Sequence, residues 1–312
     1  MKKILMIGTG GTIASVPSED GYVPGLDAQA MAKMVPGLDK LADIDCLQIM
    51  DLDSSNIGPQ HWQAMATTIA DNYAKYDGFV VTHGTDTMAY TAAALSTMLH
   101  NCQKPIVITG AQLTMEEEGT DAKNNIYFSF QAAVSEVKGV CLAFGDRVIH
   151  GLKAKKMCTE NFNGFWSINA EPMAKVVDGA LVWQSTIGGG YGEGEFFAVT
   201  ELETRVAVVK ITPGLPSEVL EYYLGKGYKG IILEGYGAGG VPNADNNWLP
   251  ALEKVLKAGV RVVCCSQCLY DGVHLDRYPI GILANRLGAE SAGEMTVEAA
   301  LCKLMVELNF VY

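Results

Sequence analysis

The sequence predicts an α/β fold, with a larger N-terminal domain built on a doubly wound, mostly parallel sheet and a smaller C-terminal α/β domain. Short apolar runs of strand length alternate with stretches of helix length, which is the pattern of a parallel sheet covered by helices on both faces. Polar turns follow several of the apolar runs directly. A chain of 312 residues with 49% apolar and 19% charged side chains suits two compact domains.

The elements of the N-terminal domain follow from the order of apolar runs and chain breakers. Pro59 suits the first turn of a helix, and Pro105 introduces a strand. Residues 14–26, rich in Pro, Ser and Gly, are predicted to form a mobile loop, and a loop of this length beside a site is often a lid. The predicted strands are 3–8, 44–50, 78–82, 106–109 and 139–144, and the predicted helices are 59–76, 87–100 and 122–137.

Residues 145–205 show no regular alternation, and the glycine-rich segment Gly188–Gly194 is the best linker candidate. We therefore predict an N-terminal catalytic domain at 1–185, a linker at 186–205 and a C-terminal domain at 206–312. Thr296 is expected to cap the last helix. The C-terminal strands are predicted at 206–211, 230–234 and 260–265, and the helices at 216–225, 246–258 and 296–308.

Charge and hydropathy exclude several classes of partner. A net charge of −12 and a pI near 4.9 argue against nucleic acid and against anionic membrane surfaces, both of which reward clustered Lys and Arg. No apolar run approaches the roughly 18 residues needed to span a bilayer. The start, Met1–Gly8, is too short in its apolar part for a signal peptide and runs into a glycine turn, so we expect a first strand and a cytoplasmic protein.

The eight cysteines are expected to be small buried hydrophobes, because most lie in apolar runs. Cys265 and Cys268 have C-x-x-C spacing, but no second Cys/His pair accompanies them as a zinc site requires. A redox role would need a thioredoxin-like unit at that position. We predict no metal.

Two similar polar turns follow predicted strands: Gly8–Thr12 after the first, and His83–Thr87 after the strand 78–82. A dinucleotide fingerprint would need a glycine where Ile13 stands, and no Gly-Lys-Ser/Thr follows for a P-loop, so we predict no cofactor. Taken singly, these turns have ordinary explanations in backbone turns and helix caps. Because open α/β sheets bind ligands at the carboxyl ends of strands, we expect both turns to face one pocket and to supply a threonine each.

Two further stretches are ambiguous on pattern alone. Asp53-Ser54-Ser55 ends a predicted strand before a helix, where exposed N–H groups favour a carboxylate, although ordinary turn chemistry explains it as well. Lys153, Lys155 and Lys156 form a basic turn, and nothing in their spacing selects one of them.

At these residues a family resemblance becomes plain. Thr9-Gly10-Gly11-Thr12-Ile13-Ala14 and His83-Gly84-Thr85-Asp86-Thr87 resemble the two signature motifs of the bacterial-type L-asparaginases. The Asp-Ser-Ser turn and the Tyr-Gly-x-Gly segment are similar to the cytoplasmic type I branch. The other stretches that resemble the family are Gly21–Pro24, Tyr76–Val80, Gly235–Gly239 and Gly293–Ala299.

The resemblance implies a role for each matching residue. Thr12 matches the nucleophile, and Tyr22 matches the tyrosine that closes over it. Thr85 and Asp86 match the second threonine and the aspartate, while Lys156 matches the active-site lysine, with Lys155 as the fallback. The remaining matches are Asp53, Ser54 and Ser55 in the turn that holds the substrate, together with Phe162 as the aromatic residue downstream of the lysine. Of the other turn residues, His83 is then expected to be structural and Thr87 to cap the helix.

The implied activity is hydrolysis of L-asparagine to L-aspartate and ammonia through a threonine-bound β-aspartyl ester. Thr85 and Asp86 would contact the substrate, Asp86 pairing with its ammonium, and Ser54 and Ser55 would hold its carboxylate. The family packs as dimers, often paired into tetramers, so a homodimer or homotetramer is implied. The rivals are a glutaminase-asparaginase, an amidotransferase subunit acting on a tRNA-linked amide, and an amino-acid-binding sensor without turnover.

One departure from the type I branch concerns regulation. A second asparagine site in that branch uses an arginine and a threonine, and the matching positions here are Glu234 and Lys155, although Cys268 does match. A cation has become an anion, which puts this regulatory site in doubt. Without it, the rate curve with asparagine is expected to be hyperbolic.

Overall fold

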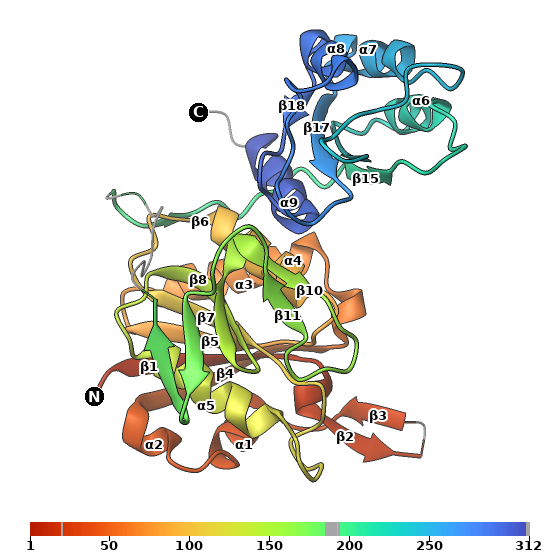
Figure 1. Cartoon of the computed structure of the whole chain (residues 1–312). Coiled ribbons are helices and arrows are strands. Elements are labelled where there is room, and N and C mark those ends of the chain that lie inside the picture. The colour runs from red at the N-terminus through yellow and green to blue at the C-terminus, as the bar shows by residue number, and fades with distance from the viewer. Residues whose placement is uncertain (20, 185–191, 193, 310–312) are drawn as a thin grey trace. The chain divides into compact units, whose positions relative to one another are not determined.

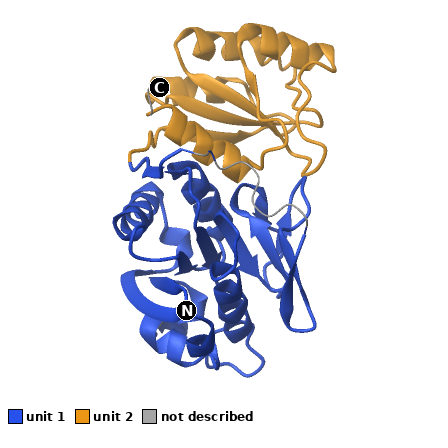
Figure 2. Cartoon of the chain, turned by 90° about the vertical axis from the view of Figure 1, so that its left-hand side faces the viewer, with its two compact units in different colours: residues 1–200 blue, residues 201–312 orange. Residues whose placement is uncertain are grey.

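The computed structural model describes residues 1–19, 21–184, 192 and 194–309 (Figure 1). The chain forms two compact units, Met1–Thr200 and Glu201–Tyr312, which are coloured separately in Figure 2. Most of the predicted linker Gly188–Gly194 lies outside the described residues, so the predicted domain limits stay a prediction.

The N-terminal unit is built on one sheet of eight strands, as the predicted fold class requires. Five parallel strands adjoin in the order β4-β1-β5-β7-β8, and three antiparallel strands, β9, β12 and β13, extend the sheet beyond β8. The strands are β1 (Lys3–Gly10), β4 (Asp43–Leu52), β5 (Gly78–Thr82), β7 (Pro105–Thr109), β8 (Gly139–Phe144), β9 (Arg147–His150), β12 (Ala174–Val177) and β13 (Ala180–Trp183). All five predicted strands of this domain are confirmed.

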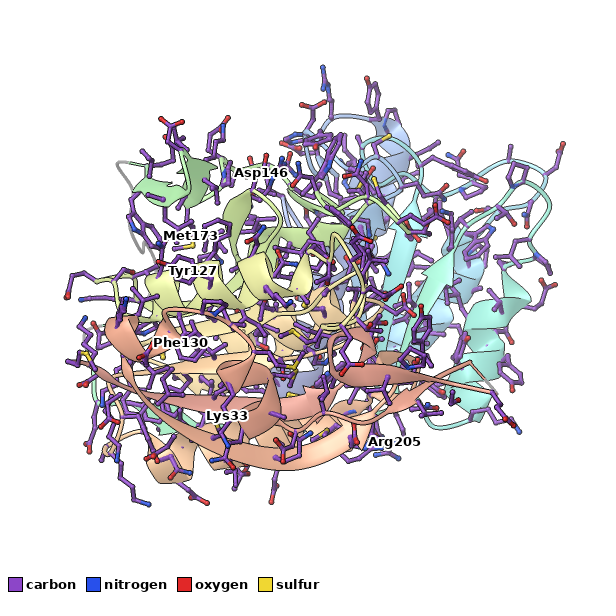
Figure 3. All side chains as sticks on the ribbon, turned by 90° about the horizontal axis from the view of Figure 1, so that it is seen from below. Lys33, Tyr127, Phe130, Asp146, Met173 and Arg205 are labelled. Carbon is purple, nitrogen blue, oxygen red and sulfur yellow. The ribbon has the colours of Figure 1, made fainter. Side chains whose placement is uncertain are left out.

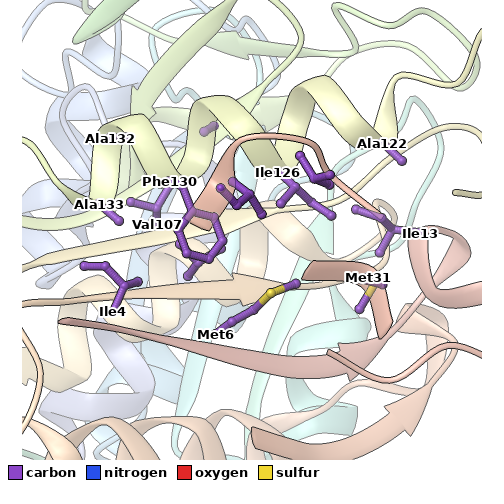
Figure 4. Packing of buried hydrophobic residues seen from close by; sticks show 14 of the residues in the cluster. Ile4, Met6, Ile13, Met31, Val107, Ala122, Ile126, Phe130, Ala132 and Ala133 are labelled. Atoms are coloured by element: carbon purple, nitrogen blue, oxygen red, sulfur yellow. The ribbon is translucent and has the colours of Figure 1, made fainter. Parts of the chain in front are cut away.

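Helices cover the sheet because alternate strand residues point to opposite faces. Ile4 and Met6 of β1 pack with Met31 of α1 and with Ile126 and Phe130 of α5 in one buried cluster (Figure 4). Figure 3 labels Phe130 together with Tyr127, a less buried residue of the same helix. The helices of this unit are α1 (Ala28–Lys33), α2 (Leu38–Leu41), α3 (Pro59–Asn72), α4 (Met88–Met98) and α5 (Ala122–Ala133).

The C-terminal unit has a smaller parallel sheet in the order β15-β16-β17-β18. Thr296 caps its last helix as predicted, because its hydroxyl accepts a hydrogen bond from the Ala299 N–H at 3.1 Å. No described helix is both long and apolar enough to cross a membrane. The elements are β15 (Val206–Lys210), β16 (Gly230–Gly235), β17 (Arg261–Ser266), β18 (Glu290–Ser291), α6 (Glu218–Gly225), α7 (Leu249–Lys257), α8 (Pro279–Leu287) and α9 (Val297–Glu307).

The prediction of a loop over residues 14–26 is wrong. Residues 14–26 contain a hairpin of β2 (Ser15–Ser18) and β3 (Gly21–Pro24), preceded by the short helix η1 (Thr12–Ala14). The described residues of the stretch 145–205 form six short strands and no α-helix, in line with the predicted lack of regular alternation, and among these strands is the hairpin of β10 (Ala154–Lys156) and β11 (Phe165–Ser167). The predicted helices 59–76, 87–100 and 122–137 also end two to four residues early, at Asn72, Met98 and Ala133.

Candidate active site

The two threonine-bearing turns lie at the topological switch point of the large sheet. From β1 the chain runs to β4 on one side and then returns to β5 on the other side of β1. Thr12 follows β1 and Thr85 follows β5, so both lie at the carboxyl ends of the two strands that flank the switch. Ligands of doubly wound folds bind at this place.

The turns meet backbone to backbone through glycines. A Cβ atom on Gly11 would lie 2.3 Å from the Gly84 Cα, and one on Gly84 would lie 2.6 Å from the Ser54 Oγ. Gly11 has a φ of +85°, and its N–H donates to the Leu52 carbonyl at 2.9 Å. The turns after β1, β4 and β5 therefore form one junction, and the prediction that the two threonine turns face one pocket and each supply a threonine to it stays a prediction.

Thr12 begins η1 and is anchored by its neighbours, because Ile13 and Ala14 are buried in the core cluster. The Thr12 side chain itself is half-buried. Within the described part of the chain its hydroxyl has no hydrogen-bond partner. The hydroxyl is thus held on a fixed backbone.

Thr85, Asp86 and Lys156 come together although the lysine lies on a separate hairpin. The Lys156 Nζ donates to the Thr85 Oγ1 at 2.8 Å and to the Asp86 Oδ1 at 2.6 Å. Lys155 pairs with Trp166 across β10 and β11, and as the preceding strand residue it points to the opposite face. Only 19% of the Lys156 side chain is exposed, against 62% of the Asp86 side chain. Lys156, and not the fallback Lys155, is therefore the lysine that contacts the second threonine turn, and its role as the active-site lysine stays a prediction.

The turn Asp53–Ser55 holds the second threonine turn as well as facing solvent. The Asp53 Oδ1 accepts from the Ser55 N–H at 2.7 Å and from its hydroxyl at 2.5 Å, and these bonds lower the pKa of Asp53. Ser54 is buried, and its Oγ accepts from the Asp86 N–H at 3.1 Å. The side chains of Ser54 and Ser55 thus already have partners in the protein.

The prediction that Thr87 caps the helix is wrong for its side chain. Thr87 stands at the N-cap position of α4 but makes no side-chain cap bond. Its hydroxyl donates instead to the Ser54 carbonyl at 2.7 Å, which ties the two turns together. The hydroxyl is satisfied by a turn more than thirty residues away in sequence, a contact that no local pattern reveals.

His83 is fully buried and serves the backbone, as expected. Its Nδ1 lies 2.7 Å from the Gly84 carbonyl, and its Nε2 lies 2.9 Å from the Thr91 Oγ1. Burial lowers the pKa of the imidazole to about 4, so it is neutral at physiological pH. A neutral ring enclosed in this way contacts no solvent and no substrate.

Tyr22 and Thr12 are the two predicted catalytic residues that, within the described chain, no hydrogen bond joins to the other predicted catalytic residues. Tyr22 lies on β3 with 57% of the residue exposed, and its hydroxyl donates to the Glu117 Oε1 at 2.8 Å. This bond is the main cause that raises the pKa of the Tyr22 phenol. Sequence reasoning missed Glu117, whose only signal was its place in the run Glu116-Glu117-Glu118.

Among the described residues no group of three or more His, Cys, Asp or Glu side chains could hold a metal ion. All eight cysteines are free thiols, and five of them are buried, including Cys264 and Cys265. Burial raises the pKa of the Cys264 thiol to about 12, which makes it a poor nucleophile. Cys268 of the C-x-x-C pair is exposed.

Comparisons with known proteins agree with this arrangement. Residues 3–187 match the family model described as "Asparaginase, N-terminal", and residues 205–309 match "Glutaminase/Asparaginase C-terminal domain". The L-asparaginase of Thermococcus kodakarensis is 39% identical over 98% of this chain and 93% of its own length. A glutamyl-tRNA(Gln) amidotransferase subunit of Pyrococcus abyssi is 37% identical over 98% of this chain and 72% of its own length.

Solved structures show the same likeness. The thermostable L-asparaginase from Thermococcus kodakarensis superimposes with a TM-score of 0.91 at 37% identity, covering 99% of this chain and 93% of that one. The probable cytoplasmic L-asparaginase from Campylobacter jejuni superimposes with a TM-score of 0.87 at 29% identity, covering 100% and 96% of the two chains. The two threonine turns, the lysine that contacts the second of them and both domain matches lead to one conclusion: this chain belongs to the asparaginase family of amidohydrolases.

Proposed function

We propose that this protein is an L-asparaginase that converts L-asparagine and water to L-aspartate and ammonia. The observation that carries the proposal is the contact of the Lys156 Nζ with both Thr85 and Asp86, beside a glycine junction that brings the Thr12 turn alongside. Two hydroxyls, an ammonium and a carboxylate are the groups needed to hold a short zwitterionic amide and to transfer its acyl group.

In this proposal the substrate is held at both ends. Asp86, whose carboxylate is largely exposed, pairs with the α-ammonium. Asp53 remains an anion because of its lowered pKa, and its carboxylate holds the Ser55 N–H and hydroxyl. The Ser54 hydroxyl accepts from the Asp86 N–H and keeps its own proton, which it donates to the α-carboxylate. Ser55 does the same once its hydroxyl has left Asp53. Fixing both ends turns binding energy into orientation of the side-chain amide.

The chemistry proceeds in two acyl transfers. The Thr12 Oγ attacks the amide carbon, the C–N bond breaks, and ammonia leaves with the threonine proton, giving a β-aspartyl ester. Water then attacks the ester, the C–O bond breaks, and the proton returns to Thr12. Because a threonine hydroxyl is a weak nucleophile, a base is needed. Tyr22 or a water acts for Thr12, and Tyr22 first has to leave Glu117. Lys156 acts on the proton of the Thr85 hydroxyl, which its Nζ contacts.

The decisive experiment measures ammonia release from asparagine and glutamine side by side. We expect release from asparagine, and its loss by at least about a thousandfold in both Thr12→Ala and Thr85→Ala while circular dichroism stays unchanged. Turnover at the wild-type rate by Thr12→Ala would remove the nucleophile assignment. Equal release from both amides would instead indicate a glutaminase-asparaginase.

Two other outcomes of this experiment would support the remaining alternative functions. The likeness to the Pyrococcus abyssi amidotransferase favours a second candidate, for which amide hydrolysis would appear only with an aminoacyl-tRNA acceptor and a partner protein. Binding of asparagine without ammonia release would indicate a sensor.

We further propose a cytoplasmic homodimer or homotetramer. The likeness to the probable cytoplasmic enzyme of Campylobacter jejuni supports the location, the family supports the assembly, and light scattering would test the latter.

A further inference from the structure

A chain of hydrogen bonds runs from two helices to the backbone of the second threonine turn. The Trp62 Nε1 of α3 donates to the Thr91 Oγ1 of α4 at 3.0 Å. Thr91 in turn lies 2.9 Å from the His83 Nε2, and the His83 Nδ1 lies 2.7 Å from the Gly84 carbonyl. The three residues whose side chains form these bonds, Trp62, Thr91 and His83, are all buried, with at most 5% of each exposed.

The chemistry of the last acceptor fixes the direction of these hydrogen bonds. A carbonyl oxygen can only accept, so the His83 Nδ1, which lies against the Gly84 carbonyl, carries the proton of the neutral ring. The Thr91 oxygen accepts from the indole N–H of Trp62 and has its own proton to give to the His83 Nε2. The Nε2 is then an acceptor, and the proton of the neutral ring lies on Nδ1, from which it is donated to the Gly84 carbonyl. This assigns a single tautomer to His83.

The Gly84 carbonyl belongs to the same peptide group as the Thr85 N–H. No peptide bond of the described chain is cis, so the carbonyl and the N–H of this group point in opposite directions. Because the carbonyl is turned to the buried imidazole, the Thr85 N–H is turned away from it. No described residue accepts a hydrogen bond from this N–H, which leaves it available to a bound ligand.

We propose that His83 is a positioning residue, held by Thr91 and Trp62, that fixes the Gly84–Thr85 peptide so that the Thr85 N–H meets the substrate oxygen as it becomes negative. This inference rests on the proposed function and adds three residues to its machinery. Gly84 also lies against Gly11, so the same hydrogen bond steadies the contact with the Thr12 turn. Burial keeps the ring neutral, so its Nε2 stays an acceptor for the Thr91 hydroxyl.

Thr91→Val is the central test, since valine has nearly the same shape and neither accepts from Trp62 nor donates to His83. A donor aimed at the developing oxyanion acts mainly in the transition state, so we expect kcat to fall about 10- to 100-fold with KM within about threefold of wild type. Thr91→Ser should restore kcat to within about threefold. A change confined to KM, or no rescue by serine, would overturn the positioning role.

Thr97→Val is the matched control on the same helix. Among the described residues, the Thr97 hydroxyl bonds only to the carbonyls of Ala93 and Ala94 within α4. This variant should therefore lose a similar amount of local hydrogen bonding and keep the wild-type kcat. If it lowers kcat as much as Thr91→Val does, the effect belongs to the helix and not to the hydrogen-bond chain.

A readout that needs no turnover separates this inference from the proposed function. In wild-type protein with ¹⁵N-labelled histidine, the His83 imidazole, assigned by its loss in His83→Asn, should carry its proton on Nδ1 at pH 7. A proton on Nε2 would refute the proposed chain of hydrogen bonds even if the enzyme is active. Absence of ammonia release with a proton on Nδ1 would instead refute the proposed function alone. Should Thr91→Val not fold, Trp62→Phe tests the same prediction, with an expected three- to tenfold loss of kcat per folded molecule.

Discussion

Lys156 joins two neighbouring residues of one turn and is the cation that balances Asp86 in the described part of the site. Replacing it by alanine leaves the buried Thr85 hydroxyl without its donor and removes the proton carrier proposed for it. We expect kcat/KM to fall at least about 1,000-fold in Lys156→Ala, as for a general base that also positions its partner. Lys155→Ala, the adjacent control on the opposite face of β10, should stay within about threefold of wild type in an ammonia-release assay. A dead Lys155→Ala with an active Lys156→Ala would reverse the assignment.

His83 also makes a prediction about stability. Its pKa is about 4 in the folded protein and about 6.5 in the unfolded chain, so below pH 6.5 the unfolded chain binds a proton that the folded protein refuses. The stabilisation is complete above pH 6.5 and is lost as the pH falls toward 4. We expect His83 alone to lower the free energy of unfolding by about 2 kcal/mol between pH 7 and pH 5. Urea titrations of wild type and His83→Asn at both pH values check this, and parallel pH dependences of the two proteins would contradict it.

At the scale of elements, the glycine junction sets the distance between the two threonine turns. An alanine at Gly11 would place its Cβ 2.3 Å from the Gly84 backbone, so the turns would have to separate. A displacement of about 1 Å can cost about a hundredfold in rate, and we expect at least this loss of kcat in Gly11→Ala. Gly179→Ala is the control: its φ of +78° is equally unfavourable for alanine, but nothing lies within 4 Å of its Cβ. Its rate should be unchanged, and a similar loss there would show that backbone strain alone is responsible.

Some of these elements could be predicted from the sequence and others could not. The buried parallel strands were predictable because each is a short apolar run, and so was the meeting of the turns that follow them. The β2–β3 hairpin was not, because Pro17 and Pro24 have the composition of a loop and the pairing comes from tertiary context. Helix α8 was missed because Pro279 and Gly281 count against a helix, although Pro279 occupies its first turn, where proline is tolerated.

Residues that act across long separations were predictable only in part. Nothing in the spacing of three lysines selects Lys156, whose contact with Thr85 spans 71 residues, and the family resemblance supplied the choice. The buried Thr91, by contrast, occupies an ordinary position in an alanine-rich helix. Its hydrogen bond to His83 depends on how α4 packs against the turn after β5, which no local pattern encodes.

At the scale of the whole molecule, each unit has its own sheet and its own buried core. The one regulatory expectation concerns Glu234 of β16, whose carboxylate lies 4.0 Å from the Lys210 Nζ. An anion at this position does not suit a second asparagine carboxylate, so we expect initial rates to follow a hyperbola in asparagine concentration, with a Hill coefficient of about 1. Sigmoidal rates in the wild-type protein would contradict this expectation. Glu234→Arg is the informative variant, because sigmoidal rates in this variant alone would support the expectation.

The glycine junction also decides how the site should respond to heat. The closest approach of the two threonine turns is a main-chain contact, set by Gly11 against Gly84 and by the hydrogen bond from Gly11 to Leu52. Substitutions that loosen the apolar core should therefore reduce the number of working molecules before they change the turnover of each one. Substitutions in the core are therefore expected to change stability, whereas a change of substrate has to come from the side chains around this main-chain contact.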